Sequence, residues 1–146
     1  MKPRLHRSFG ADACGAAAPF VLVLSLFAGA PLRAEDVDWT LEMMAEVEGM
    51  PLEALRAGVG GGWESFPEYL DHLDGNLGVN AAFLVGHCAL RRYVMGERGS
   101  GNVAEPDDLE AMRSLLDEAL AAGALGFSSS QSFPHNDGDG TPIPSR

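Results

Sequence analysis

Two helices are predicted between residues 36 and 58 from the spacing of apolar side chains. Trp39, Met43 and Val47 recur at i, i+4 and i+8, so they would share one face of a helix over residues 36–48. A proline and a glycine bracket a second, shorter helix over residues 52–57. This pattern is typical of helices that cover a core with one face only.

The stretch from residue 63 to residue 95 combines a capped helix, a buried strand and an abrupt return to polar residues. Ser65 and Glu68 fit the S-x-x-E capping box, which indicates the start of a helix. The run Val79–Val85 is almost wholly apolar, as expected of a strand covered on both faces. His87 and Arg91 follow directly, and we expect them in a polar loop at the strand's carboxyl end, where α/β folds usually place ligands.

A second strand is predicted after a long helix. Pro106 begins this helix, acidic residues occupy its first turn, and Gly123 suits its C′ position. The strand follows over Ala124–Ser128, and Ser128–Arg146 is predicted to be a loop that leaves its carboxyl end. The two strands and the intervening helix form a β-loop-α-β unit with parallel strands, so the predicted fold class is α/β. The apolar face of the helix is predicted to consist of Leu109, Met112, Leu116 and Leu120.

Composition and charge exclude several classes of partner. The 146 residues carry 10 Lys and Arg against 21 Asp and Glu, a formal net charge of −11. Such an acidic chain is unsuited to nucleic acid or to an anionic membrane surface, and we expect neither as a partner. Cys14 and Cys88 are too few for a disulfide framework and are not spaced like a zinc knuckle. Cys88 is predicted to be a small packing residue.

Residues 1–26 allow two interpretations. Basic residues, an apolar run over residues 16–28 and the sequence Ala28-Gly29-Ala30 together have the form of a secretory signal peptide. The apolar run is too short, and too interrupted by proline, for a transmembrane helix. Alternatively, Phe20–Leu26 is a strand of the fold, in which case we expect a cytoplasmic protein rather than a secreted or periplasmic one.

Four side chains are candidates for contact with a ligand or for supporting such a contact, and none is expected to be catalytic. They are His87, Arg91, Ser128 and His135. His87 would orient a substrate or hydrogen-bond nearby backbone carbonyls, and Arg91 would hold a carboxylate or form an internal ion pair. Ser128 begins three serines at a strand end, but the G-x-S-x-G pattern of a serine hydrolase is absent from the sequence. His135 precedes Asn136–Gly140, which lacks the distal glutamate of a calcium loop and is predicted to be a glycine turn.

Four further segments carry a resemblance to a known family. They read W-E-S-F-P-E-Y-L at residues 63–70, L-G-V-N-A-A-F-L-V-G-H-C-A-L-R at 77–91, Met112–Ser130, and His135–Arg146. In this order they resemble the D-aminoacylase, or N-acyl-D-amino-acid deacylase, family of the amidohydrolase superfamily. The resemblance covers residues 27–146. Several motifs in one order are more specific than any one of them.

The resemblance implies that residues 27–146 are part of a (β/α)8 barrel of the metal-dependent amidohydrolase type. It implies a zinc-dependent hydrolase that cleaves the linear amide of a small N-acyl-D-amino acid. In the family a zinc-binding cysteine precedes the segment that begins at Phe27, and this chain has Ser25 there. A serine hydroxyl is a poor zinc ligand compared with a thiolate. The family's other zinc ligands and its catalytic aspartate have no matching positions here, so we expect this chain alone to bind no zinc and to be inactive.

Two functions from different classes remain open. The first is an enzyme lineage, in which the chain is part of such a deacylase. The second is a small secreted acidic protein, or a non-catalytic binding domain, that retains part of the barrel scaffold. Because the resemblance begins at Phe27, ahead of Ala28-Gly29-Ala30, we favour the strand over the signal peptide for the residues before it.

Overall fold

The computed structural model describes residues 31–59, 62–78 and 80–145. The predicted strand Phe20–Leu26, the signal-like segment and Ser25 lie outside the described residues, as does Val79. Within the described ranges the helices are η1 (Ala34–Asp36), α1 (Val37–Glu48), α2 (Leu52–Gly58), α3 (Phe66–Leu73), α4 (His87–Met95), η2 (Gly96–Gly99) and α5 (Pro106–Ala122), and the strands are β1 (Leu84–Gly86) and β2 (Gly126–Ser128).

The two strands pair in parallel, as predicted. Leu84 lies opposite Gly126 and Gly86 lies opposite Ser128, so three residues of each strand form the ladder. Both strands are shorter than the predicted Val79–Val85 and Ala124–Ser128. The connection between them contains α4 and α5 rather than the single predicted helix. The described residues therefore form a mixed α/β structure around a short parallel sheet.

The residues after β1 form a helix, which corrects the prediction of a polar loop. Helix α4 begins at His87, immediately after Gly86. His87 and Arg91 are four residues apart and share one side of the helix. Buried side chains pack along the remainder of α4, and this packing holds the segment in helical form. The buried residues of α4 are Cys88, Ala89, Leu90 and Met95.

Helix α1 forms where the apolar spacing predicts it, and α2 forms between the proline and glycine that predict its ends. Met43 is fully buried, and Trp39 and Val47 pack against it at the predicted spacing. Their cluster also contains Cys88 and Ile143, so the segment after β2 packs onto α1 and α4. Helix α1 ends at Gly49, whose positive φ of 63° is readily adopted by glycine.

Helix α3 begins with the predicted capping box. The hydroxyl of Ser65 accepts a hydrogen bond from the backbone N–H of Glu68 at 3.4 Å. In return, the Glu68 carboxylate accepts from the backbone N–H groups of Glu64 at 2.8 Å and Ser65 at 3.1 Å. These hydrogen bonds, the one from Glu64 first, hold the pKa of Glu68 below its usual range.

This depressed pKa makes the capping box sensitive to acid. The carboxylate of Glu68 stabilises the fold above its unfolded-state pKa, and that contribution is lost as the pH falls through the lower folded-state pKa. We expect Glu68→Gln to be less sensitive to acidification than the unmodified chain, measured by urea unfolding at neutral and acid pH. Ser65→Ala is the matched control, because it removes the other half of the box and should cost about 1 kcal/mol at neutral pH, but it keeps the Glu68 carboxylate and therefore stays sensitive to acid. Parallel pH profiles for Glu68→Gln and the unmodified chain would contradict this expectation.

Helix α5 covers the principal core, but its buried stripe differs from the predicted one. Met112 and Ala119 are buried, and Leu116 packs beside them. Leu109 and Leu120 are instead 57% and 43% exposed. Leu109 lies in the first turn, ahead of the buried stripe, and Leu120 lies about 100° around the helix from its buried neighbour. The principal core consists of Phe66, Val85, Leu90, Met95, Met112 and Ala119.

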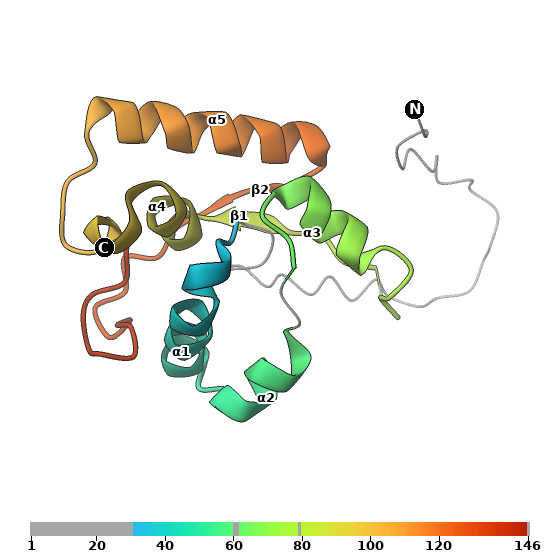
Figure 1. The fold of residues 1–146 in the computed structure, drawn as a ribbon, viewed down its shortest axis with the longest axis horizontal. Coiled ribbons are helices and arrows are strands. Elements are labelled where there is room, and N and C mark those ends of the chain that lie inside the picture. Colours follow the sequence, from blue (N-terminus) through green and yellow to red (C-terminus); the bar gives the residue numbers. More distant parts are fainter. Residues whose placement is uncertain (1–30, 60–61, 79, 146) are drawn as a thin grey trace.

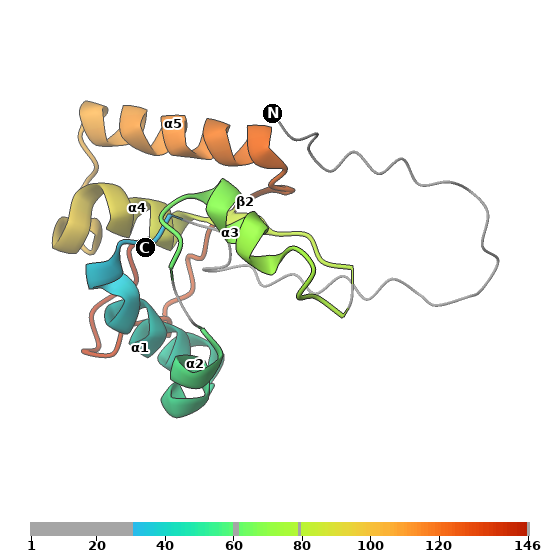
Figure 2. The same ribbon diagram turned by 45° about the vertical axis from the view of Figure 1, so that its right-hand side comes forward.

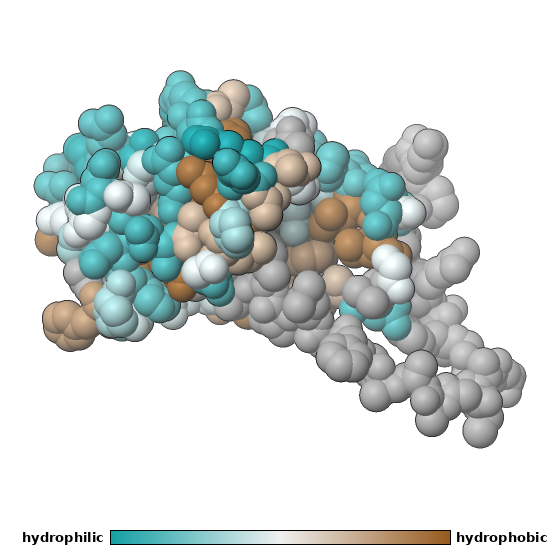
Figure 3. Space-filling model, turned by 90° about the horizontal axis from the view of Figure 1, so that it is seen from below, coloured by the Kyte–Doolittle hydropathy of each residue, from teal (hydrophilic) through white to brown (hydrophobic). Residues whose placement is uncertain are grey.

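Helices lie on opposite sides of the short sheet (Figure 1). Helix α5 runs along one side, and α1 and α2 lie on the other side in both ribbon views (Figures 1 and 2). Seen from below Figure 1, most of the described surface is hydrophilic, with smaller apolar areas between (Figure 3). Several large apolar side chains around β2 are exposed: Leu125 just before the strand, Phe127 within it and Phe133 after it. This arrangement leaves the carboxyl ends of β1 and β2 at one edge, next to the start of α4.

Candidate functional site

Two polar side chains meet at the carboxyl ends of the paired strands. His87 directly follows β1, and Ser129 directly follows β2. Because Gly86 and Ser128 are paired in the sheet, the next residue of each strand emerges at the same edge. His87 Nδ1 lies 2.9 Å from Ser129 Oγ, within hydrogen-bond distance. We call these two residues the His87–Ser129 pair.

The surroundings of His87 favour an uncharged imidazole. Its ring lies against Phe127, with ring centroids 5.3 Å apart. Burial lowers the pKa of His87 below its ordinary value of 6.5, and the positive charge of Arg91 lowers it further. His87 is therefore neutral at physiological pH, with one ring nitrogen carrying a proton and the other able to accept.

The guanidinium of Arg91 donates hydrogen bonds to backbone carbonyl oxygens. It donates to the carbonyl oxygen of Gly99 at 3.1 and 3.0 Å and to that of Asn102 at 2.6 Å. These contacts tie α4 to η2 and to the loop before α5. A Cβ at Gly99 would lie only 3.1 Å from the Arg91 carbonyl oxygen, so a glycine fits this close approach. The predicted internal ion pair is replaced by hydrogen bonds to backbone carbonyl oxygens.

A second histidine and serine form a more enclosed arrangement beside the first. Ser130 Oγ lies 2.9 Å from His135 Nδ1. The carbonyl oxygen of Ser130 accepts from Ser145 Oγ at 2.7 Å, and Ser145 Oγ accepts from the Cys88 thiol at 3.0 Å. This network fastens the segment after β2 to α4.

The sequence pointed to a run of three serines and to two histidines as candidates, but among the serines it singled out Ser128 rather than Ser129 or Ser130. Ser128 belongs to β2 and is paired in its ladder, whereas Ser129 and Ser130 approach the histidines. The three serines are identical in type and adjacent, so only the exact end of the strand distinguishes them. Side chains alternate along extended backbone, and this alternation directs neighbouring serines to different partners.

Two other predictions are confirmed. Cys88 is only 1% exposed and packs in the cluster with Met43 and Ile143, and burial raises the pKa of its thiol. The segment 136–140 is a turn, in which Asp137 Oδ1 accepts from the backbone N–H groups of Asp139 and Thr141. Gly140 has a φ of 81°, which glycine adopts without strain.

The described residues contain no cluster of side chains that could bind a metal ion. Within residues 31–59, 62–78 and 80–145, no three His, Cys, Asp or Glu side chains lie close enough to hold a metal ion together. His87 and His135 each use Nδ1 in a contact with a serine hydroxyl. These residues therefore do not by themselves fit the zinc ion that the resemblance implies.

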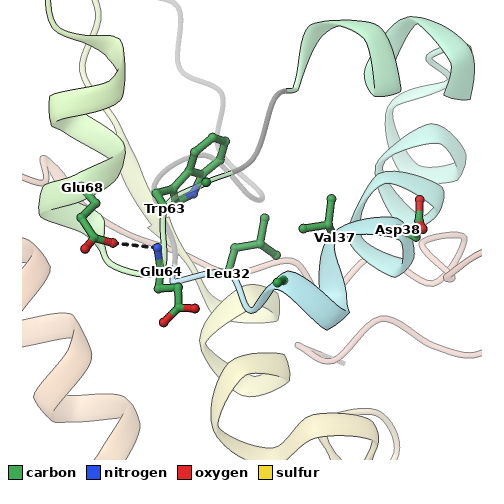
Figure 4. A pocket seen from close by; sticks show the side chains of 8 residues that line it. Leu32, Val37, Asp38, Trp63, Glu64 and Glu68 are labelled. Carbon is green, nitrogen blue, oxygen red and sulfur yellow. Dashed lines mark hydrogen bonds between the residues drawn. The ribbon is translucent and has the colours of Figure 1, made fainter.

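A cavity of about 650 Å³ lies elsewhere in the structure (Figure 4). Trp63 and Glu64 line one part of it, and Leu32 and Val37 line another (Figure 4). None of the four predicted candidates lines it. Glu68 also lines it, and its carboxylate accepts the backbone hydrogen bond from Glu64 that Figure 4 draws. The remaining lining residues are Ala34, Asp38 and Gly62.

Comparison with known proteins reveals relatives for part of this sequence. The chain is 40% identical over 85 residues to a D-aminoacylase of Alcaligenes xylosoxydans xylosoxydans, which is 58% of this chain and 17% of that protein. Part of this chain is similar to D-aminoacylases. It is also 48% identical over 56 residues to an N-acyl-D-aspartate deacylase of the same organism, which is 38% of this chain and 11% of the relative.

A third relative has no assigned activity. It is an uncharacterized protein of Mycobacterium tuberculosis, 36% identical over 93 residues, or 60% of this chain and 15% of the relative. The chain thus spans less than a fifth of the length of each of these relatives. No protein-family model matches the chain, and no solved structure matches it.

Proposed function

We propose that this chain is a segment of the catalytic barrel of a hydrolase that cleaves the linear amide C–N bond of N-acyl-D-amino acids. The observation that carries the proposal is the 40% identity over 85 residues to a D-aminoacylase. The parallel β1–β2 pair with helices between supports it, because repeated βαβ units build a (β/α)8 barrel. In such barrels, ligands bind at the carboxyl ends of the strands, which is where the His87–Ser129 pair lies.

Zinc and the chemical step belong, in this proposal, to residues beyond those described here. Amide hydrolysis of this type needs an activated water, a general base and donors for the oxyanion. The described residues bring no three metal ligands together. The chain alone would accordingly hold no zinc and show no turnover, and its substrate in the whole enzyme would be a small N-acyl amino acid.

None of the described helices has the length and apolar character of a membrane-spanning segment.

The proposal is tested by exchanging segments with the D-aminoacylase that the chain resembles. The 85 aligned residues of this chain would replace their counterparts in that enzyme. We expect the chimera to retain zinc and to hydrolyse N-acetyl-D-leucine in preference to the L enantiomer, because the exchanged segment would supply the same part of the barrel. The measurements are metal content after dialysis and the rate of release of free leucine.

Two controls make the result decisive. A chimera carrying the same residues in scrambled order should fail to fold and lose activity, which shows that the exchanged segment matters. The second control is the 146-residue chain alone, assayed with added zinc. A folded, zinc-loaded chimera without activity toward N-acyl-D-amino acids would refute the proposed function.

A further inference from the structure

The His87–Ser129 pair contains two hydrogen-bond donor groups when His87 is neutral. A neutral imidazole carries one N–H and a serine carries one O–H, so the pair holds two protons in all. One of them lies in the 2.9 Å contact between His87 Nδ1 and Ser129 Oγ. Whichever nitrogen of His87 is protonated, one donor is left for a further acceptor. That donor is Ser129 O–H in one tautomer and His87 Nε2–H in the other.

The position of the pair makes this donor accessible to a ligand. Ser129 is exposed and His87 is half-buried. Both residues follow the carboxyl ends of parallel strands, and β2 is held in register with β1 up to Ser128. The ring of Phe127 covers one side of His87 and limits its freedom to rotate. The donor is thus presented from the ends of two paired strands.

The charge beside the pair favours an anionic acceptor. The positive charge of Arg91 acts on the His87 ring. Arg91 itself is anchored to the carbonyl oxygens of Gly99 and Asn102, so its charge is fixed in place. A hydrogen bond from a neutral donor to a carboxylate is stronger than one to a neutral acceptor, and neighbouring hydrogen bonds reinforce each other.

The other histidine–serine contact is not a comparable site. His135 and Ser130 belong to the network that continues through Ser145 to the buried Cys88. Ser145 is only 5% exposed and Cys88 only 1%. That network fastens the segment after β2 to the fold, whereas Ser129 faces solvent.

We infer that the His87–Ser129 pair binds the carboxylate of the substrate, with Ser129 O–H donating to the carboxylate and His87 Nδ1–H donating to Ser129 Oγ. This inference rests on the proposed function for the identity of the ligand as an N-acyl-D-amino acid. His87 acts through Ser129 and is a positioning residue. Ser129 makes the direct contact.

The inference is tested by nuclear magnetic resonance on the full 146-residue chain. The ring nitrogens of His87 report its tautomer during titration with N-acetyl-D-leucine, with acetate, and with N-acetyl-D-leucinamide, which lacks the carboxylate. We expect the two carboxylates to shift the His87 nitrogens and the amide to leave them unchanged. Ser129→Ala should weaken binding of N-acetyl-D-leucine by about tenfold or more, the loss expected for one hydrogen bond to a charged group.

Matched variants separate binding from folding. Ser129→Thr keeps the hydroxyl and should restore binding, and Ser132→Ala removes a nearby serine hydroxyl and should not weaken it. The dispersion of the backbone amide signals checks that each variant is folded. Binding of N-acetyl-D-leucine that is unchanged in Ser129→Ala, or equal binding of the amide, would overturn the inference and leave the proposed function standing.

The same titrations also distinguish a wrong substrate class from a wrong binding site. If acetate binds in a way that depends on Ser129 but N-acetyl-D-leucine does not bind, the carboxylate site stands and the proposed substrate class is wrong. If no carboxylate shifts the His87 nitrogens, the inference is overturned.

Discussion

Replacing Arg92 with alanine is expected to lower the free energy of unfolding by about 3 kcal/mol, as when one partner of a buried ion pair is removed. Arg92 Nε donates to Asp36 Oδ1 at 2.6 Å, and the two side chains are only 17% and 7% exposed. Its guanidinium also lies over the Trp39 ring, 4.4 Å from the centroid. The variant would leave the Asp36 carboxylate buried without its partner, and would loosen η1 and α1 from α4.

The ion pair between Arg113 and Glu110 provides the matched control. Its nitrogen and oxygen lie 2.7 Å apart, but both side chains are about two-thirds exposed, at 68% and 67%. Because solvent screens such a pair, Arg113→Ala should change the free energy of unfolding by less than about 0.5 kcal/mol. Urea unfolding followed by circular dichroism measures both variants. Equal losses at Arg92 and Arg113 would show that burial of the first pair does not matter.

Replacing Leu90 with alanine is expected to cost about 3 kcal/mol, because the variant leaves a cavity in the principal core. Leu90 is 2% exposed and belongs to the cluster with Phe66, Val85 and Met112. These side chains come from α3, β1 and α5, so Leu90 connects α4 to three other elements. Without the Leu90 side chain, these elements would hold β1 and the start of α4 in place less firmly.

Leu109 offers the same substitution at an exposed helical position. It lies in α5 and is 57% exposed, so Leu109→Ala should change stability by less than about 0.5 kcal/mol. The two variants remove the same atoms from a helix, and the difference between them measures burial. A Leu90→Ala chain as stable as Leu109→Ala would mean that the principal core does not form in solution.

Features set by neighbouring residues were predictable from sequence. Ser65 and Glu68 cap α3 as expected, because both partners lie within one turn. Gly123 ends α5 with a φ of 119°, since few other residues adopt that conformation. The apolar spacing of Trp39, Met43 and Val47 likewise identified the buried face of α1.

Features set by residues far apart in the sequence were not predictable from it. The polar character of His87 and Arg91 suggested a loop, but burial of Leu90 and Met95 against other elements makes the segment helical. His87 meets Ser129 across 42 positions of sequence, and nothing local distinguishes this serine from its neighbours. The Arg91 guanidinium donates to the carbonyl oxygens of Gly99 and Asn102, because the chain turns back at η2 and lies against α4.

The cluster that joins α1 to the segment after β2 bears on how the chain folds as it is made. Met43 lies near the beginning of the described chain and Ile143 near its end, and both are fully buried in one cluster with Cys88. Cys88 and Ser145, which are hydrogen-bonded, are 57 positions apart. Contacts of such long range form late, after the intervening chain has become available. During translation, Met43 would therefore leave the ribosome long before Ile143 can cover it, and the nascent chain would expose an apolar surface that chaperones recognise.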